Sequence, residues 1–266
     1  MLVVVGIVSL LILRILPSFA AAREQAKIVV CLSNLRQIGV AHTAYIFETN
    51  RVPVGIRPGP RQDVLAPWSF GGKGNRAIWP AVHSWDAGQR PINPYIYPNF
   101  SFSSPDPSKL EAIDHVRPEL PVFRCPSDTT SYAFLPWGEP SDVPAYEDIG
   151  TSYTQNMLYT TCQCMVTKSG HDLQSSLDTG LSKLSMRYGD RFVFYLEEAA
   201  NEAIHRQKRY MGDHGEIGRH TVAFLDGHAA YVRMDTTQAS GENWMMLDPD
   251  LPDPFDLDDQ SSDEAE

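Results

Sequence analysis

The chain opens with a segment that is apolar on all sides. Residues 2–13 carry no charge, and only Gly6 and Ser9 interrupt the aliphatic side chains. A spanning helix needs about 20 apolar residues, whereas about 10–14 also suit a signal peptide or a core helix. A cleavable signal peptide has basic residues before its apolar run, and here none precedes it. Residues 20–22 nevertheless resemble a cleavage site. We interpret residues 1–22 as a membrane anchor, formed by Leu2, Val3, Val4, Val5, Ile7, Val8, Leu10, Leu11, Ile12, Leu13, Ile15 and Leu16.

The next segment, residues 23–50, has the pattern of an amphipathic helix. Apolar side chains recur at spacings of three and four, which is a helical stripe. Asn50, Pro53 and Gly55 end it. The pattern predicts one helix of nearly 50 residues, kinked at Pro17; an anchor followed by an unrelated helix is the alternative. The stripe consists of Ile28, Cys31, Leu32, Leu35, Ile38, Tyr45 and Ile46.

Residues 51–145 are rich in proline and tryptophan. Sixteen of the 20 prolines lie there, with four of the five tryptophans, Trp68, Trp79, Trp85 and Trp137. Proline lacks the N–H donor and fixes φ, which excludes a long helix or a central strand. The aromatic content is too high for plain disorder. We predict a folded, irregular region.

Residues 146–246 are predicted to form a β-rich head. Residues 191–196 are short and aromatic, as in a strand. Residues 221–225 and 228–234 flank Asp226-Gly227, the strongest local hairpin signal. With a two-residue turn, Val222 faces Tyr231 and Ala223 faces Ala230. Both faces of this hairpin are apolar, so we expect both to be covered.

The formal net charge of −11 comes mostly from the C-terminus. Residues 247–266 hold nine acidic residues and no basic one, which leaves 24 acidic against 22 basic residues elsewhere. Without a basic stripe, the chain is not expected to bind nucleic acid. The tail cannot bury enough apolar surface to fold, and we predict a solvated segment. A calcium site, the alternative, lacks the usual glycine turn and ligand spacing.

Three histidines near the hairpin have the composition of a metal cluster. The two-residue turn, however, puts His220 and His228 on opposite faces, about 17 Å apart at roughly 3.3 Å per residue. We therefore predict no metal site, and place His214, in a glycine-rich loop, at the surface. Glu197 and Glu198 are adjacent on a strand end and would point to opposite faces, so they cannot act as an acid–base pair.

The sequence contains no nucleotide-binding, metalloprotease or serine-hydrolase motif. Cys162 and Cys164 form a C-x-C pair, but structural zinc normally wants a second pair. We therefore predict no catalytic residues, no cofactor and no small-molecule substrate. Cys125 as a nucleophile with a distant histidine has neither support nor contrary evidence in the sequence.

The N-terminal 45 residues resemble type IV pilins and type II secretion pseudopilins. MLVVVGIVSLLILRILP matches the apolar segment that follows the G-F-T-L-I-E signal in those chains, with Pro17 at the family's helix kink. AAREQAKIVVCLSNLRQIG resembles a bacterial prepilin-type subgroup. Three later elements are similar to that subgroup: FRCPSD at residues 123–128, TSYTQN at 151–156, and RHTVAFLDGH at 219–228, which contains His220, Asp226 and Gly227.

Three features depart from the family pattern, and one of them is Arg14 in place of an aliphatic residue. The G-F-T-L-I-E signal is absent, and with it the peptidase site and the glutamate for subunit registration; we expect a start codon upstream. His220 is followed by five residues before Asp226, where the subgroup has nine. Arg14, Arg23 and Lys27, all after the apolar run, would by the positive-inside rule keep the head in the cytoplasm. The family's basic leader implies the opposite, and we follow the resemblance.

The resemblance also bears on two cysteines. Cys31 and Cys125 both lie in subgroup-like elements, one on the helix and one in FRCPSD. If the head faces an oxidising compartment, the two could form a disulfide between helix and loop. Two separate buried thiols are the alternative.

Together these observations predict an α+β, pilin-like fold, in which a long N-terminal helix packs on an antiparallel sheet beside a proline-rich irregular region. We expect the helix to pack on the face of the hairpin that carries Phe224. The resemblance implies a non-enzymatic structural subunit, anchored once in a bacterial inner membrane with its head in the periplasm or outside the cell. It would be processed and methylated and would assemble with other pilin-like subunits into a pilus or pseudopilus.

Two alternatives belong to other classes. One is an anchored periplasmic binding domain that never assembles and uses Trp68, Trp79 and Trp85 as its ligand surface. A weaker one is an anchored hydrolase, for which the sequence displays no convergent titratable residues.

Overall fold

The computed structural model describes residues 2–57, 64–75, 85–102, 118–132, 140–160 and 172–251. Within these ranges, the side chains of residues 2, 3, 5–8, 10, 11, 57, 64 and 65 are not described. All statements about structure below refer to the described part. Cys162, Cys164, Trp79, Trp137 and the tail from residue 252 onward lie outside it.

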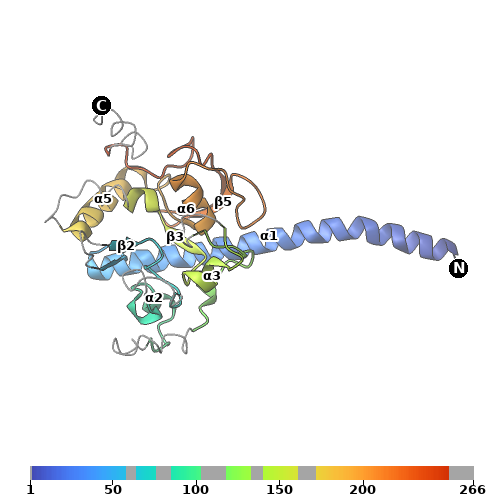
Figure 1. Ribbon diagram of the computed structural model, residues 1–266, viewed down its shortest axis with the longest axis horizontal. Helices are drawn as coiled ribbons and strands as arrows, with labels where there is room; N and C mark the ends of the chain where they lie inside the picture. The colour runs from blue at the N-terminus through green and yellow to red at the C-terminus, as the bar shows by residue number, and fades with distance from the viewer. Residues whose placement is uncertain are drawn as a thin grey trace.

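A single helix, α1 (Leu2–Thr49), organises the molecule. Its N-terminal part extends well beyond the rest of the chain, while its C-terminal part runs along the folded head (Figure 1). The helix continues through Pro17, and the Ser18 hydroxyl donates a hydrogen bond to the Ile15 carbonyl at 2.8 Å. The kink at Pro17 stays a prediction. No helix among the described residues is both long and apolar enough to cross a membrane.

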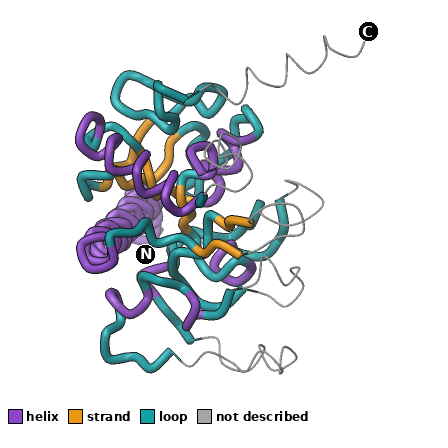
Figure 2. Tube along the Cα trace, turned by 90° about the vertical axis from the view of Figure 1, so that its left-hand side faces the viewer, coloured by secondary structure: helices purple, strands orange, loops and turns teal. Residues whose placement is uncertain are grey.

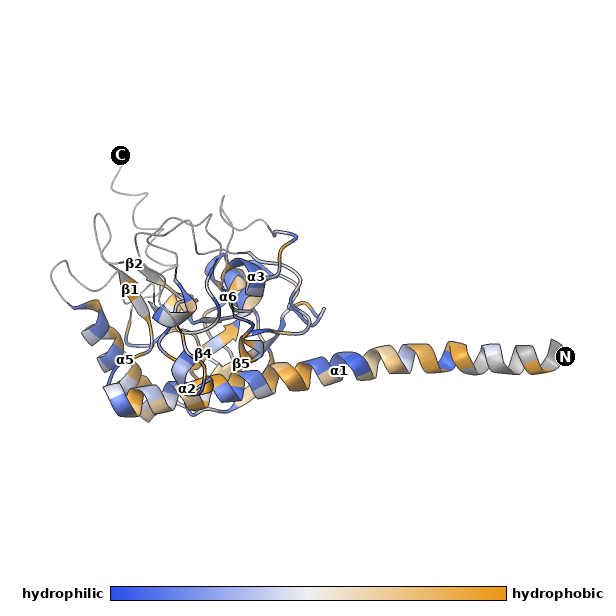
Figure 3. Cartoon of the chain, turned by 90° about the horizontal axis from the view of Figure 1, so that it is seen from below, coloured by the Kyte–Doolittle hydropathy of each residue, from blue (hydrophilic) through white to orange (hydrophobic). Residues whose placement is uncertain are grey.

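The exposure of α1 changes along its length. Apolar side chains of the projecting part are exposed, among them Leu13 at 70% and Phe19 at 68%. From Ile28 onward one stripe is buried, and Cys31, Leu35 and Ile38 are completely inaccessible. In Figure 3 the coloured turns of the projecting part are mostly orange, whereas the helix beside the head alternates between blue and orange. The predicted stripe is therefore the face that packs on the head.

The head contains a four-stranded antiparallel sheet in the order β3-β4-β5-β6. The strands are β3 (Tyr153–Gln155), β4 (Val193–Glu197), β5 (Arg219–Phe224) and β6 (Ala229–Arg233). The last three confirm the strands predicted from the sequence. The sequence analysis had not identified α5 (Leu173–Tyr188) or α6 (Glu198–His205). The fold is thus α+β, with a long helix on an antiparallel sheet.

The hairpin register differs by one residue from the prediction. Ala223 pairs with Ala229 and Val222 with Ala230. The Phe224 N–H donates to the His228 carbonyl at 2.9 Å, so the turn contains three residues and not two. Gly227 has φ of +89°, the left-handed conformation that a three-residue loop requires at its last position.

The expected contact with the helix is also reversed. Leu35 and Ile38 of α1 pack in one cluster with Ala223 and Ala229, on the face opposite Phe224. Phe224 instead packs with a second cluster that includes Leu196, Ile204 of α6 and Met246. Small side chains let the helix approach closely: a β-carbon on Gly39 would lie 3.5 Å from the Gly227 backbone. Both faces of the sheet are covered, as expected, but α1 packs on the face opposite Phe224 and α6 packs on the Phe224 face.

The proline-rich region folds around short elements on the other side of α1 from α5 and α6 (Figures 1 and 2). β1 (Gly55–Arg57) pairs with β2 (Val64–Ala66), and four single turns follow. Trp68 and Trp85 are buried with Ile149, so they do not form the exposed ligand surface of the binding-domain alternative. The four turns are η2 (Ala87–Gln89), α2 (Asn93–Ile96), η4 (Pro121–Phe123) and α3 (Ala145–Asp148).

Two buried cations hold this region together. The Arg90 guanidinium is 1% exposed and donates to the carbonyls of Trp68, Gly71 and Ile149, each at 2.6 Å. Lys73, 2% exposed, lies 2.7 Å from a Glu147 carboxylate oxygen and over the Tyr146 ring. Irregular backbone is thus satisfied by side chains in place of a sheet.

The head ends later in the chain than the sequence predicts. Leu247 and Asp248, which the sequence analysis assigned to the solvated tail, are buried, and Met246 and Leu247 pack in the Phe224 cluster. The Met246 carbonyl accepts a hydrogen bond from Asn156 at 2.7 Å. The head therefore extends beyond residue 246.

His42 on α1 provides a test of the helix–sheet contact. The ring is buried and lies 2.8 Å from the Tyr195 hydroxyl, and burial lowers its pKa to about 3. The unfolded chain, with a pKa near 6.5, binds the proton first, so stability is complete above pH 6.5 and declines toward pH 3. We expect about 2 kcal/mol less unfolding free energy at pH 5 than at pH 7 from this group. Denaturant unfolding of wild type and His42→Gln at both pH values measures it; an equal pH dependence in the two proteins would contradict the assignment.

Candidate functional site

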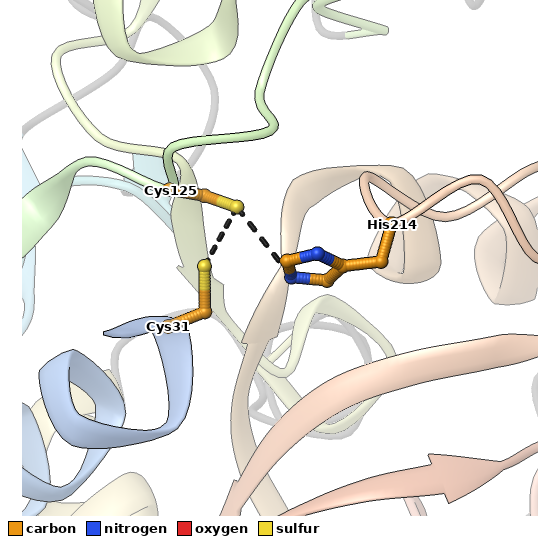
Figure 4. A group of neighbouring side chains, drawn as sticks. All are labelled: Cys31, Cys125 and His214. Atoms are coloured by element: carbon orange, nitrogen blue, oxygen red, sulfur yellow. Dashed lines mark hydrogen bonds between the residues drawn. The ribbon is translucent and has the colours of Figure 1, made fainter. Parts of the chain in front are cut away.

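Three side chains from distant segments meet beneath the helix–head contact. Cys31 lies on α1, Cys125 lies two residues after η4, and His214 lies in the loop before β5 (Figure 4). The two sulfur atoms are 2.8 Å apart, and His214 Nε2 is 3.7 Å from Cys125 Sγ. One ligand atom from each residue lies within 4.8 Å of the other two. All three residues are buried, with exposed fractions of 0, 1 and 6%.

The His214 ring is oriented by a carboxylate of the helix. Its Nδ1 lies 2.8 Å from Glu24 Oε1. Glu24 also accepts from the Ser127 hydroxyl at 2.9 Å and pairs with Lys27 at 3.1 Å. In the neutral ring, Glu24 accepts a hydrogen bond from Nδ1–H, so that the Nε2 lone pair faces the cysteines.

The surroundings shift the pKa values of the two thiols in opposite directions. The hydrogen bond from Cys125 lowers the pKa of Cys31 to about 6, with smaller contributions from His214 and Tyr153. Burial raises the pKa of Cys125. For His214, burial lowers the pKa, but hydrogen bonds with Cys31 and Glu24 outweigh it and raise the pKa overall.

Carboxyl groups surround this group of side chains. Burial raises the pKa of Asp213 well above its usual range, and the neighbouring charges of Glu197, Asp128 and Cys31 raise it further. Burial also raises the pKa of Glu198, both of whose oxygens accept from the Tyr132 N–H. The site is thus lined by acidic groups whose ionisation is opposed by burial and by the charge of their neighbours.

The elements that resemble the prepilin subgroup converge on the same place. In the C-P-S-D element, Asp128 accepts from the Ala145 and Tyr146 N–H groups at the start of α3. It also accepts from the Ser152 hydroxyl at 2.6 Å, and Ser152 in turn accepts from the Cys125 N–H at 2.9 Å. These bonds fix the position of the Cys125 backbone.

The other motif residues anchor neighbouring segments. Asn34 of α1 donates to the Arg124 carbonyl at 3.0 Å and to the Tyr153 hydroxyl at 3.4 Å. Asn156 donates to the carbonyls of Val193 and Met246. The motifs therefore form the scaffold that holds α1, the C-P-S-D turn and β3 in register.

The structure brings together some of the predicted site residues and separates others. Cys31 and Cys125, the disulfide candidates, are in contact as free thiols. His214, predicted at the surface, is buried beside them. This loop position was missed because its burial comes from α1, 190 residues away in sequence at Glu24.

The hairpin residues take separate roles. His220 is buried against Glu197, with Nδ1 facing a carboxylate oxygen. His228 is exposed, lies 2.6 Å from Asp226 and stacks on Phe224. Alternation in the observed register puts His220 and His228 on the same face, so the opposite-face argument was wrong, but they form no shared group with His214 among the described residues.

The glutamates after β4 also differ from the prediction. Glu197 is the last residue of β4, whereas Glu198 already begins α6. The adjacent strand positions assumed in the sequence analysis are therefore not present. Each carboxyl group is buried and each has its own partners, Glu197 with His220 and Thr221, and Glu198 with Tyr132.

The fold and the site define an α+β protein in which a long helix packs along the head and a cysteine–histidine group is buried at their contact. The chain belongs to the family described as protein of unknown function DUF1559, whose model matches residues 20–186. The match includes Cys31 and Cys125 and ends before His214. No curated protein and no solved structure matches the chain significantly.

Proposed function

We propose that the protein is a membrane-anchored, pilin-like structural subunit whose projecting helix both holds it in a bacterial inner membrane and packs with other subunits. The observation that carries the proposal is the exposed apolar surface of the projecting part of α1. Val4, Leu13, Leu16 and Phe19 are each at least 60% exposed. A surface of this kind on a soluble head requires a cover.

The sequence of the same segment favours a lipid bilayer as the environment of this apolar surface. Residues 2–13 contain no charged side chain, and Arg14 is near enough to one end to reach an interface. The resemblance to pilins adds a second role, because in that family the same helix packs in a bundle at the filament core. The head would then lie in the periplasm or outside the cell, as the family's leader implies.

The proposal is tested by fractionating cells that express the full chain from its native start. We expect the wild-type protein to stay in the membrane pellet after an alkaline carbonate wash. Leu13→Asp with Leu16→Asp should move it to the supernatant, since each change costs about 3–4 kcal/mol in a spanning helix. Val40→Asp with Phe47→Asp is the matched control: these side chains are 70% and 93% exposed on the same helix, but beside the head.

Assembly is a separate question from anchoring. Intact mass and N-terminal sequence of the membrane protein should reveal a processed, methylated N-terminus upstream of Met1, and sheared cell-surface fractions should contain filaments with this chain. An anchored protein with an unprocessed Met1 and no oligomer would instead favour the binding-domain alternative. A wild-type protein in the soluble fraction would contradict the anchor itself.

A further inference from the structure

We infer that Cys31, Cys125 and His214 form a binding site for a divalent metal of the zinc class, which fastens the projecting helix to the head. The inference does not depend on the proposed function, because it concerns only the head and the packed part of α1. Thiolate sulfur and imidazole nitrogen are the ligands that zinc prefers. Here they come from three segments that are otherwise far apart in the chain.

The orientation of His214 is the first argument. Metal-binding histidines typically donate the second ring N–H to a carboxylate, which fixes the tautomer and aims the other nitrogen at the metal. Glu24 has this position, 2.8 Å from Nδ1, and is itself held by Ser127 and Lys27. A pair of thiols that served only packing would not need a histidine fixed in this way.

The distances are the second argument. With Zn–S near 2.3 Å and Zn–N near 2.0 Å, tetrahedral coordination places two sulfurs about 3.8 Å apart and nitrogen about 3.5 Å from sulfur. The Nε2–Sγ distance of 3.7 Å fits directly. The Sγ–Sγ distance of 2.8 Å must open by about 1 Å, which side-chain rotation can supply. The same distance is also longer than the roughly 2.05 Å of a disulfide.

The surrounding charge is the third argument. Asp213 is next to His214 in sequence and close enough to interact with Cys125 through its charge, and Glu197 and Asp128 interact with Asp213 in the same way. A divalent cation in this region would favour the ionised form of these carboxyl groups, and two thiolates form when it binds. The two thiol protons pass to solvent.

Three protein ligands leave a fourth position open. A water molecule can complete the tetrahedron, as in zinc sites with three protein ligands. The loop that carries His214 has exposed residues at Met211 and Ile217.

The first test establishes the state of the isolated protein. The full chain is purified from the cells that express it in the presence of an alkylating reagent, and its zinc content and its cysteine-linked peptides are measured. One zinc per chain, with Cys31 and Cys125 not linked, is the expected result. A peptide pair joined by a Cys31–Cys125 disulfide would overturn the inference, whatever the reduced chain binds afterwards.

The second test identifies the ligands with Co²⁺ as a spectroscopic probe. The wild-type chain, stripped of metal and reduced, should bind one Co²⁺ with a thiolate-to-cobalt charge-transfer band. His214→Gln should bind at least tenfold more weakly, and Cys31→Ser should lose most of the band. His228→Gln, an exposed histidine of the same region, is the matched control and should bind as wild type. No thiolate band in the wild-type protein, or an unchanged affinity in His214→Gln, would overturn the assignment.

The role of Glu24 as a positioning residue has its own readout. Glu24→Ala should keep one Co²⁺ per chain but weaken its binding by about 10–100-fold, the usual effect of losing a carboxylate behind a metal-bound histidine. Glu48→Ala, on the same helix and bonded to Tyr95, is the control. Equal affinities in the two variants would show that Glu24 does not orient the ligand.

Discussion

Replacing Arg90 with Met is expected to destabilise the head by about 3 kcal/mol or more. The guanidinium lies in the proline-rich region and donates to the carbonyls of Trp68, Gly71 and Ile149, each at 2.6 Å. Methionine fills similar volume but donates no hydrogen bond, and each buried carbonyl left without a donor costs about 1–3 kcal/mol. Urea unfolding of the head, followed by tryptophan fluorescence, measures the loss.

Two further variants make this result specific. Arg90→Lys keeps the charge but not the planar fork that reaches several carbonyls, so it should recover only part of the stability. Arg187→Met is the control: its ion pair with Asp250 is exposed on both sides, and such pairs contribute about 0–1 kcal/mol. If Arg90→Met unfolds within about 1 kcal/mol of wild type, Arg90 does not hold the region together.

The periodicity of the sequence was sufficient to predict the elements on which the head depends. The stripe from Ile28 to Ile46 gave a helix whose packed face is the observed one, because a helical repeat of three and four fixes which side chains share a face. The strands around Asp226-Gly227 were found for a different reason, because an Asp-Gly pair between two short apolar runs is a local hairpin signal. Helix α5 carries a comparable signal, with Leu173, Leu177, Leu181 and Leu184 buried after an Asp172 cap, which the sequence analysis had overlooked.

What the sequence did not determine is the register of the hairpin. An Asp-Gly pair fits both a two-residue turn and the end of a three-residue loop, and the two differ by one residue in pairing. A shift of one residue moves every side chain to the other face. The exchange of the faces that pack on α1 and α6 is a separate matter, because alternation along β5 keeps Ala223 and Phe224 on opposite faces in either register.

The candidate site could be predicted only in part, because its members are joined by tertiary packing. Cys31 and Cys125 could be paired because both lie in elements that resemble one protein subgroup. His214 lies between Asp213 and Gly215 in a polar loop, where no periodic pattern indicates burial. Its partner Glu24 lies on a helix turn with charged and polar residues, as in a solvent-exposed segment. Only the docking of the loop on α1 makes this histidine an internal residue.

The second large effect is expected at the buried pair formed by Glu197 and His220. Both side chains are inaccessible to solvent, and Glu197 Oε1 faces His220 Nδ1. The other carboxylate oxygen accepts from the Thr221 hydroxyl at 3.1 Å. Glu197→Leu leaves His220 and Thr221 buried without their acceptor. Losing one member of a buried pair of this kind costs about 3–5 kcal/mol.

A double-mutant cycle separates this pair from simple packing. His220→Leu alone should also be costly, but Glu197→Leu with His220→Leu should lose markedly less than the sum of the single variants, because apolar replacement of a whole buried pair is often nearly neutral. Glu216→Leu, which removes an exposed carboxylate that pairs with Arg219, is the control and should change stability by less than about 1 kcal/mol. Strictly additive losses would contradict a direct coupling of Glu197 with His220, and the strand ends would then be held by Thr221 and the backbone alone.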